Sequence, residues 1–438
     1  MSRAGEINPI MRLIKGGGRN PEPISRVLRP VNWGWVTVVA SLLLSLLGIY
    51  AIDMGLNENL DPTLGQLSTT AIKQFIFMIM GILACLVIML PHYKLVSAFA
   101  WLYFVICIAL LVFLLVPGIP SSIVTPRNGA RSWINLGVTD FQPSEITKIA
   151  FVLGVAQYLR FRTQHRKLRG LVVPGIIAMI PVGLITVQPD LGTASLFVPA
   201  LFAMLIAAGA RLRHLTLIVL CAAMSAPIAY PFMRPHQKAR IEAIVKQFQG
   251  DESTNFDINF QSSRAQMLIA AGQVTGTPEP TARALVRYNA LPERENDMIF
   301  AVVVARFGLL GGMAMLGLYA LWVIGALIVA ASCREPMGRL IAVGLPAFIA
   351  TQVIINVGMN IGILPIIGIT LPFLSAGGSS LITCWIMTGL LMNVAFHRPK
   401  PPYRSSFEYA DDDDQPHPLK PSRPYGKQVG FSGRAFTR

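Results

Sequence analysis

Long apolar runs, separated by short polar segments, follow one another along most of this 438-residue chain. A helix of about 20 apolar residues crosses the hydrocarbon core of a bilayer, so each run predicts a membrane-spanning helix. The runs lie near residues 34–52, 74–90, 95–116, 146–159, 171–187, 193–210, 214–232, 308–332, 339–364 and 379–396. The run at 146–159 is short, and its helix is expected to extend back into Glu145. The pattern predicts an all-α, polytopic membrane protein of about ten transmembrane helices, with a large extracytoplasmic loop, residues 233–307, between spans 7 and 8.

The composition supports a bilayer protein. Hydrophobic residues make up 53% of the chain and charged residues 13%, whereas a soluble domain carries about 25% charged residues. The first apolar run is too long for a signal peptide and lacks a cleavage site, so it is expected to stay as the first span. Residues 398–438 are rich in Pro, Ser and charge and are expected to be disordered. The predicted organisation is a basic cytoplasmic segment (1–31), a membrane domain (32–397) and a cytoplasmic tail (398–438).

The net charge of +15 fits either nucleic-acid binding or cytoplasmic membrane loops. The basic residues lie at the termini and in short loops between apolar runs, which argues against a nucleic-acid partner. With the N-terminus inside, the cytoplasmic loops contain Lys94, Arg160, Arg162, Arg166, Lys167, Arg169, Arg211, Arg213 and Arg334. The first external segment instead carries Asp53, Glu58 and Asp61 against Lys73. The positive-inside rule therefore predicts a multi-pass protein of the inner (cytoplasmic) membrane with both termini in the cytoplasm.

Two of the four polar places on the predicted external side lie before the fourth and sixth spans. The first contains Arg131 and then Gln142, Glu145 and Lys148. Glu145 and Lys148 are three residues apart at a helix start, so they share a face and can pair, either as a structural ion pair or as part of a site. The second is the tight turn Gln188–Ala194, where Asp190 caps the next helix or faces a polar cleft.

The third polar place is the long external loop, which carries Arg240 early and Asp297 as its last charge before the apolar stretch Met298–Val304. A carboxylate at the water–lipid boundary is partly desolvated, which raises its pKa toward that of a general base. The alternative for Asp297 is an exposed N-cap. The fourth place, Asn356–Ser380, is rich in Gly and Pro, which predicts broken helix lining protein or a polar cavity.

A helix N-terminus with small hydroxyls is a natural anion site, and the segment Gly377–Ser380 opens the last span in this way. A pyrophosphate would suit such a site. No Cys and His spacing typical of a metal site occurs in the chain.

These four blocks, in this order between the spans, resemble the shape, elongation, division and sporulation (SEDS) family, to which RodA and FtsW belong. The resemblance covers about residues 34 to 396. Its most specific parts are the Gly-Ala-Arg-Ser-Trp with Phe-Gln-Pro-Ser-Glu block, Gln-Pro-Asp-Leu-Gly-Thr-Ala, and Leu-Pro-Phe-Leu-Ser with Gly-Gly-Ser-Ser. The resemblance implies ten spans and a peptidoglycan glycosyltransferase that polymerises lipid II beside a class B penicillin-binding protein.

The resemblance also implies roles for particular residues. Asp297 matches the family's catalytic aspartate, which precedes an Ile/Val-Phe-Ala-Val stretch, here Ile299–Val302. Glu145 would orient Lys148, and Asp190 would order the same site. The implied substrate-binding residues are Arg131, Gln142, Glu145, Lys148, Asp190, Arg240, Asn356, Ser375, Ser379 and Ser380. No cofactor is implied with certainty, and a divalent cation, Mg or Mn, is a further candidate.

The chain departs from the family pattern at several positions. An acidic pair usually follows the Ile-Phe-Ala-Val stretch, and this chain has Ala305-Arg306. Asn296 and Met298 replace the usual neighbours of the aspartate. The segment Asn296-Asp297 favours the elongation type, whereas Asn360 favours the division type. Two other functions stay open. One is a lipid II flippase, which would need no general base, and the other is an inactive scaffold for a penicillin-binding protein, which the missing acidic pair makes plausible.

Overall fold

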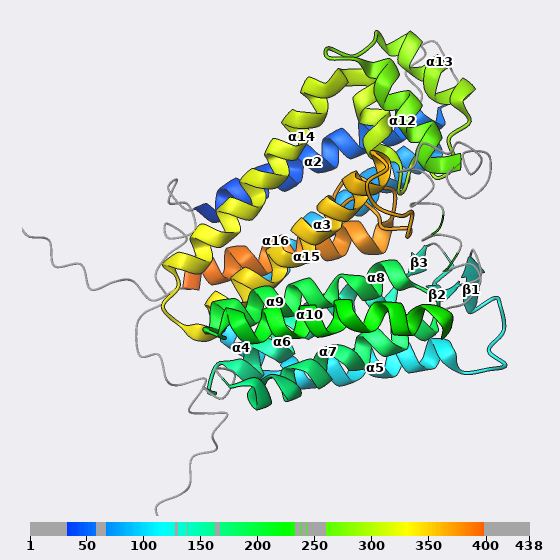
Figure 1. Ribbon diagram of the computed structural model, residues 1–438. Coiled ribbons are helices and arrows are strands. Elements are labelled where there is room, and N and C mark those ends of the chain that lie inside the picture. The colour runs from blue at the N-terminus through cyan, green and yellow to red at the C-terminus, as the bar shows by residue number, and fades with distance from the viewer. Residues whose placement is uncertain are drawn as a thin grey trace, which may run out of the picture. The chain divides into compact units, whose positions relative to one another are not determined.

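The computed structural model describes residues 33–57, 67–127, 130–137, 139–162, 167–232, 238, 242 and 260–397. The two terminal segments, 1–31 and 398–438, lie outside the described residues, and so does Arg240. The described part is mainly helical (Figure 1).

Each predicted apolar run coincides largely with a helix or with two consecutive helices, although the run at 339–364 extends past its helix, which ends at Asn360. The helices are α2 (Trp33–Leu56), α3 (Thr69–Met89), α4 (Tyr93–Ala98), α5 (Ala100–Leu115), α6 (Pro143–Leu159), α7 (Val172–Val187), α8 (Leu191–Ser195), α9 (Phe197–Ala208), α10 (Leu212–Ala229), α12 (Phe260–Gly272), α13 (Glu279–Asn289), α14 (Ile299–Ser332), α15 (Pro336–Asn360) and α16 (Gly378–His397), with short 3₁₀ turns η4 (Leu168–Leu171) and η5 (Tyr230–Phe232). Helix α6 begins at Pro143, so the expected extension into Glu145 is confirmed. Within the described residues, 7 helical segments are long and apolar enough to cross a membrane, and Ala100–Leu115 and Leu212–Met224 are shorter apolar helices. The protein is polytopic, and the exact number of spans stays a prediction.

The prediction of an all-α protein is wrong between α5 and α6. This segment forms a three-stranded antiparallel sheet of β1 (Val124–Arg127), β2 (Ala130–Asn135) and β3 (Asp140–Phe141), in the order β1-β2-β3. Trp133 pairs with Thr125, and Ile134 pairs with Val124 on one side and Phe141 on the other. β-Branched and aromatic residues favour strands, but the strands are too short to stand out beside the apolar runs.

Helix α14 begins at Ile299, nine residues before the predicted start at 308. Its first turns, Ile299–Ala305, are buried, whereas a bend at Gly308 (φ 68°, ψ −172°) interrupts the helix. The loop after α12 supplies backbone hydrogen bonds on both sides of this bend. Leu309 N donates to Gln273 O (2.9 Å), and Leu310 N donates to Val274 O (3.1 Å). On the other side, Arg306 O accepts from Thr277 N (3.2 Å). A Cβ at Gly308 would lie 2.3 Å from Gly276 N. Only glycine fits both this conformation and this contact.

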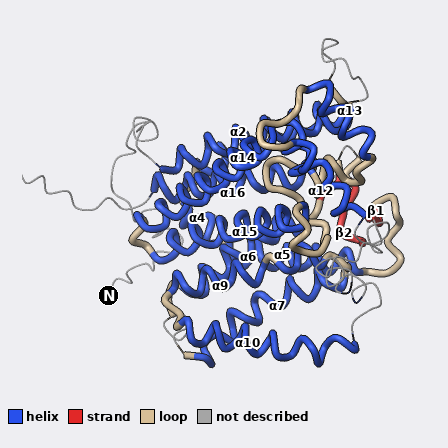
Figure 2. Tube along the Cα trace, turned by 45° about the horizontal axis from the view of Figure 1, so that its top comes forward, coloured by secondary structure: helices blue, strands red, loops and turns tan. Residues whose placement is uncertain are grey.

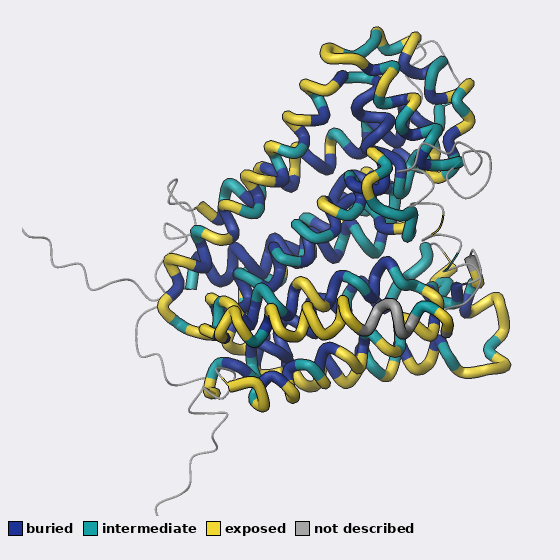
Figure 3. Tube along the Cα trace, in the orientation of Figure 1, coloured by how far each residue is buried: buried dark blue, intermediate teal, exposed yellow. Residues whose placement is uncertain are grey.

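Helices α6, α15 and α16 are mostly buried, whereas α10 is largely exposed (Figure 3). Helix α16 packs mainly on α3, and α14 packs on α2 and α15. The approach of α3 and α16 is close because glycines face the contact: a Cβ at Gly389 would lie 2.3 Å from Ile88 Cγ2 and 2.8 Å from Cys85 O. The outward faces of α3, α5 and α7 carry exposed large apolar side chains, as expected for lipid contact.

Replacing Gly389 by Leu should separate α3 from α16 and destabilise the protein by about 1–3 kcal/mol, the usual result of overpacking. The measurement is the apparent unfolding temperature in detergent. Gly317→Leu is the matched control, because a Cβ at Gly317 meets nothing within 4 Å. Equal losses in the two variants would contradict the close approach described above.

Candidate functional site

The polar residues singled out in the sequence gather at one end of the bundle. Helices α3, α6, α8, α14 and α16 begin at this end, and α2 and α15 finish there. The sheet and the helices α12 and α13 lie at the same end, opposite α4 (Figure 2). Direct contacts join the parts: Gln142 N donates to Ser379 Oγ (3.2 Å), and Gln142 Nε2 donates to Asp190 Oδ2 (3.3 Å). The fold thus brings together segments that lie up to 237 residues apart in the chain.

Asp297 lies at the centre of this cluster, two residues before α14. Its backbone carbonyl accepts hydrogen bonds from Asn356 Nδ2 (2.8 Å) and Asn360 Nδ2 (2.9 Å), both on the last turns of α15. Met298, not Asp297, occupies the N-cap of α14. The exposed N-cap proposed as an alternative for Asp297 is therefore wrong, and the carboxylate is not used for capping.

The carboxylate of Asp297 is partly exposed, and its environment disfavours the charged form. Burial in the protein, with smaller contributions from the charges of Glu293, Asp190 and Glu295, raises the pKa of Asp297 to about 7. No hydrogen bond to this carboxylate is found within the part of the chain that the structure describes. A Cβ at Gly368 would lie 3.5 Å from Asp297 Oδ2, so the broken segment between α15 and α16 borders the carboxylate. The group can act as a general base near neutral pH.

Asp190 has the capping role considered for it and also contacts Gln142. Its Oδ1 caps α8 by accepting from Thr193 N (3.0 Å), and its Oδ2 accepts from the Gln142 amide. Burial raises the pKa of Asp190, hydrogen bonds from Thr193 oppose the rise, and the charge of Glu145 adds to it. The start of α8 touches the broken segment, because a Cβ at Gly192 would lie 2.4 Å from Ile367 O.

Glu145 and Lys148 form the predicted pair, with Lys148 Nζ 2.8 Å from Glu145 Oε1. Both residues are deeply buried, at 4% and 1% exposure. Within the described chain, Glu145 Oε2 is buried without a hydrogen-bond partner, as are Ser132 Oγ and Ser144 Oγ nearby in sequence. A buried ion pair is weak as a stabilising device because desolvation offsets its attraction. An unsatisfied acceptor beside it fits a polar ligand or water better than a sealed core.

Other predicted substrate-binding residues are occupied by the protein itself. Arg131 donates from Nη2 to Ile119 O (3.1 Å) rather than to a member of the Asp297 cluster. Ser379 Oγ donates to Asp140 O (2.9 Å) and ties α16 to the sheet. Ser380 interacts with the Cys384 thiol one turn along α16. Arg240 lies outside the described residues.

The expected divalent cation has no obvious ligand set. Across the residues that the structure describes, no group of three or more His, Cys, Asp or Glu side chains could hold a metal ion. No step of the chemistry is therefore assigned to a metal.

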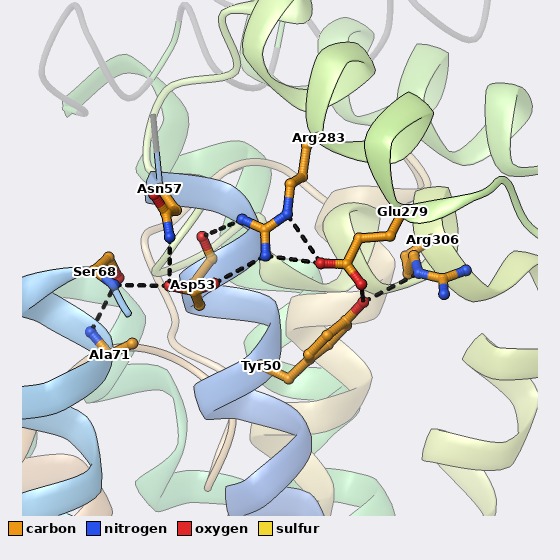
Figure 4. Close-up of polar contacts among 8 residues, drawn as sticks. All are labelled: Tyr50, Asp53, Asn57, Ser68, Ala71, Glu279, Arg283 and Arg306. Atoms are coloured by element: carbon orange, nitrogen blue, oxygen red, sulfur yellow. Dashed lines mark hydrogen bonds and ion pairs between the residues drawn. The ribbon is translucent and has the colours of Figure 1, made fainter. Parts of the chain in front are cut away.

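A second polar cluster at this end was missed in the sequence (Figure 4). Arg283 of α13 donates from Nη2 to Asp53 Oδ2 of α2 (3.0 Å) and to Glu279 Oε1 (2.8 Å). Tyr50 Oη donates to Glu279 Oε2 (3.0 Å) and accepts from Arg306 Nε (3.1 Å). The cluster fastens α13 to α2 and α14. The spacing of Glu279 and Arg283, four residues apart, could have indicated one of its pairs.

This cluster accounts for Arg306, one of the departures from the family pattern. Besides Tyr50, its Nη1 donates to Thr277 O (2.8 Å), and its guanidinium lies 5.0 Å from the centre of the Phe307 ring. Burial alone would raise the pKa of Glu279, but hydrogen bonds from Arg283 and Tyr50 outweigh burial and lower it. In this protein the position therefore holds a cation that anchors the bend of α14.

The described residues form a polytopic membrane bundle with a polar cluster at one end, which contains a buried ion pair, a capping aspartate and the Asp297 carboxylate. The family model for FtsW, RodA and SpoVE, described as cell cycle protein, matches residues 33–400. The chain belongs to this family.

Relatives and solved structures agree with this assignment. Stage V sporulation protein E of Bacillus subtilis is 32% identical over 82% of this chain and 95% of that protein. Peptidoglycan glycosyltransferase MrdB of Escherichia coli K12 is 33% identical over 67% of this chain and 77% of that protein. A chain of a peptidoglycan synthase complex that coordinates polymerization and crosslinking matches with a TM-score of 0.69 and 25% identity, over 82% of this chain and 97% of that chain. The crystal structure of RodA from Thermus thermophilus shares the fold, with a TM-score of 0.59 and 23% identity over 84% of this chain and 98% of RodA.

Arg283→Ala should lower the free energy of unfolding by about 3 kcal/mol, because it leaves the buried carboxylate of Asp53 without a counter-charge, held only by hydrogen bonds from Ser68 N and Asn57 Nδ2. Faster hydrogen exchange over residues 260–290 would accompany the loss. Arg287→Ala, one turn along α13 at an exposed position, is the control and should change stability by about 1 kcal/mol or less. The attachment of α13 through Arg283 would be refuted if both variants behaved alike.

Proposed function

We propose that this protein is a peptidoglycan glycosyltransferase that polymerises lipid II into β-1,4 glycan strands on the outer face of the cytoplasmic membrane. Family membership and the relatives named as peptidoglycan glycosyltransferases support the class of reaction. The observation that carries the mechanism is the carboxylate of Asp297, which has a pKa of about 7 and no hydrogen-bond partner found among the described residues.

The reaction is a single displacement at a sugar carbon. Asp297 takes the proton from the 4-hydroxyl of an acceptor GlcNAc, and that oxygen forms a bond to the anomeric carbon of a MurNAc. The bond from this carbon to undecaprenyl pyrophosphate breaks, and the pyrophosphate leaves with the bonding electrons. Inversion converts the α linkage into a β linkage. General-base assistance of this kind contributes about 10²- to 10⁴-fold to the rate.

Cationic groups offset the charge of the departing pyrophosphate. Lys148 is the described candidate inside the cluster, where Glu145 orients its ammonium group at 2.8 Å. Asp190 and Gln142 line the same side of the cluster. The sequence adds Arg131 and Arg240 as candidates, together with the hydroxyls at the start of α16. Ser379 Oγ already bonds to the sheet and Gly377 N already donates to Gln74 Oε1, so the backbone amides of the first turn of α16 after Gly377 are the better anion donors.

The proposed setting is a chain of ten spans with both termini in the cytoplasm. The positive-inside pattern supports it: Lys94 and Arg334 flank helix ends opposite the Asp297 cluster. A site at the outer membrane boundary suits a lipid-linked substrate, which arrives from the bilayer. A class B penicillin-binding protein is the proposed partner, supported by the similarity to a synthase complex that coordinates polymerization and crosslinking.

Asp297→Asn should reduce glycan polymerisation by about 10²-fold or more, because the amide cannot accept the proton. The assay uses purified protein with its penicillin-binding partner and labelled lipid II, and separates chain lengths on a gel. In the wild type the rate should rise with pH through about 7, where the base ionises, and level off above it. This rise of the rate on the acid side of the pH profile, the acid limb, should be absent in the variant.

The fold should survive this substitution, because the cluster holds Asp297 through its main chain. A carboxyl whose pKa is raised in the folded state opposes folding once it ionises. At pH 8 the Asp297→Asn protein should therefore unfold at the same or a higher temperature than the wild type. Full polymerisation by a well-folded variant would favour a flippase or scaffold instead, since neither needs a base.

Glu293→Gln should move the acid limb of the polymerisation rate to lower pH while leaving the maximal rate nearly unchanged. The charge of Glu293 raises the pKa of Asp297, and glutamine keeps an oxygen for the hydrogen bond from Asn296 (2.6 Å). Because Glu293 is exposed, salt screens its charge and the shift should be about a few tenths of a pH unit. The difference in the acid limb between the variant and the wild type should shrink in 1 M salt, where the Debye screening length is about 3 Å. An unchanged acid limb at low salt would contradict this electrostatic role.

A further inference from the structure

The main chain around Asp297 is held at three successive carbonyl groups. Glu295 O accepts from Ala376 N (2.8 Å), and Asn296 O accepts from Ser375 Oγ (2.6 Å). Asp297 O accepts from both Asn356 Nδ2 and Asn360 Nδ2. All the donors come from α15 or from the segment that joins it to α16. We name these donors, Asn356, Asn360, Ser375 and Ala376 N, the carbonyl clamp.

The two amides of the clamp have no donor capacity left for a substrate. Asn356 Nδ2 donates its second hydrogen to Ile369 O (2.7 Å). Asn360 Nδ2 also faces Asn356 O (2.9 Å) and Asn356 Oδ1 (3.3 Å). Three acceptors around one atom require that this atom be the nitrogen of the amide. An Asn side chain carries only two N–H donors, so both amide nitrogens are saturated, whereas Asn360 Oδ1 is buried without a hydrogen-bond partner among the described residues.

Ser375 is equally engaged, because its hydroxyl donates to Asn296 O and accepts from Leu371 N (2.7 Å). Behind it, Gln74 of α3 donates from Nε2 to Ser375 O (2.9 Å) and accepts from Gly377 N (3.1 Å). The clamp is therefore anchored to a second helix. Asn356 and Asn360 are fully buried, at 0% exposure, so water does not compete for their hydrogen bonds.

We infer that Asn356 and Asn360 are positioning residues for Asp297, not substrate-binding residues: they fix the main chain so that the carboxylate needs no side-chain support. This inference rests on the proposed function. A hydrogen bond given directly to a carboxylate stabilises its charged form and weakens it as a base. Holding the carbonyl instead leaves every oxygen lone pair of Asp297 available to the acceptor hydroxyl.

The charged groups around Asp297 are consistent with this arrangement. Glu293 and Glu295 lie in its own segment, and Asp190 faces it from the start of α8. The Glu145–Lys148 pair of α6 lies beyond Asp190. The charges of Glu293, Asp190 and Glu295 all disfavour the charged form of Asp297, so the carboxylate would turn toward water if its main chain were released. Its pKa would then fall toward the ordinary range for aspartate.

The test compares Asn356→Ala, Asn360→Ala and the double variant in polymerisation of lipid II, with kcat, KM and the pH profile measured for each. Either amide alone still reaches the Asp297 carbonyl, so each single substitution should lower kcat only a few-fold. The double variant should lose about 10²-fold in kcat, the scale expected when a reacting group is displaced by about 1 Å. This loss should exceed the product of the single effects. Its acid limb should move to lower pH while KM stays within about two-fold.

Asn393→Ala is the matched control. Asn393 is also a fully buried helical asparagine whose Nδ2 joins two backbone carbonyls, Ile88 O (2.6 Å) and Pro91 O (2.5 Å), at the opposite end of the bundle. It should lose stability to a similar degree without a shift of the acid limb. Thermal unfolding of all variants in detergent gives the comparison.

Three results would contradict the inference or the proposed function on which it rests, and the measurements distinguish them. A raised KM with an unchanged acid limb would make the amides substrate-binding residues. Behaviour like that of Asn393→Ala would make them structural only. Retained activity in Asp297→Asn would reject the proposed base itself, independently of the asparagine variants. Should the double variant fold poorly, Asn360→Ala alone must still shift the acid limb downward for the inference to stand.

Discussion

A broken helix inside a membrane protein must have its backbone groups satisfied by the protein, because lipid offers no hydrogen bonds. In the segment between α15 and α16, side chains satisfy the backbone groups. Asn356 Nδ2 donates to Ile369 O, and Ser375 Oγ accepts from Leu371 N. Gln74 donates to Ser375 O and accepts from Gly377 N. The same side chains reach the residues before α14. The requirement to satisfy irregular backbone therefore determines where Asp297 lies.

The electrostatics at this end of the bundle depend on which groups the hydrogen-bond donors already contact. Amides and hydroxyls are consumed by backbone carbonyls, so the carboxylates of Asp297 and Glu145 retain unbonded oxygens among the described residues. Among the described residues near Asp297, Lys148 is already paired with Glu145, and Arg283 belongs to the separate cluster with Asp53. A partly desolvated carboxylate among other acids keeps its proton up to neutral pH, which suits a base in sugar transfer.

The sequence predicted those features that depend on local pattern. The apolar runs located the helices, and the three-residue spacing of Glu145 and Lys148 predicted their ion pair. The position of Asp297 before an apolar stretch correctly indicated partial burial. Long-range partners were beyond this reasoning. Asn356 is a predicted substrate-binding residue, and its amide donates to the carbonyl of Asp297, 59 residues away. The bond between Arg283 and Asp53 spans 230 residues, and no local spacing reveals it.

The bend in α14 has a mechanical consequence. Its interrupted hydrogen bonds are completed by the loop that joins α12 to α13, and the helical stretch before the bend begins two residues after Asp297. Helices α12 and α13 are therefore joined by backbone hydrogen bonds to the helix that follows Asp297. Because this loop bonds to the backbone on both sides of Gly308, a displacement of α12 or α13 would reach the segment of Asp297 through peptide groups and not through flexible side chains.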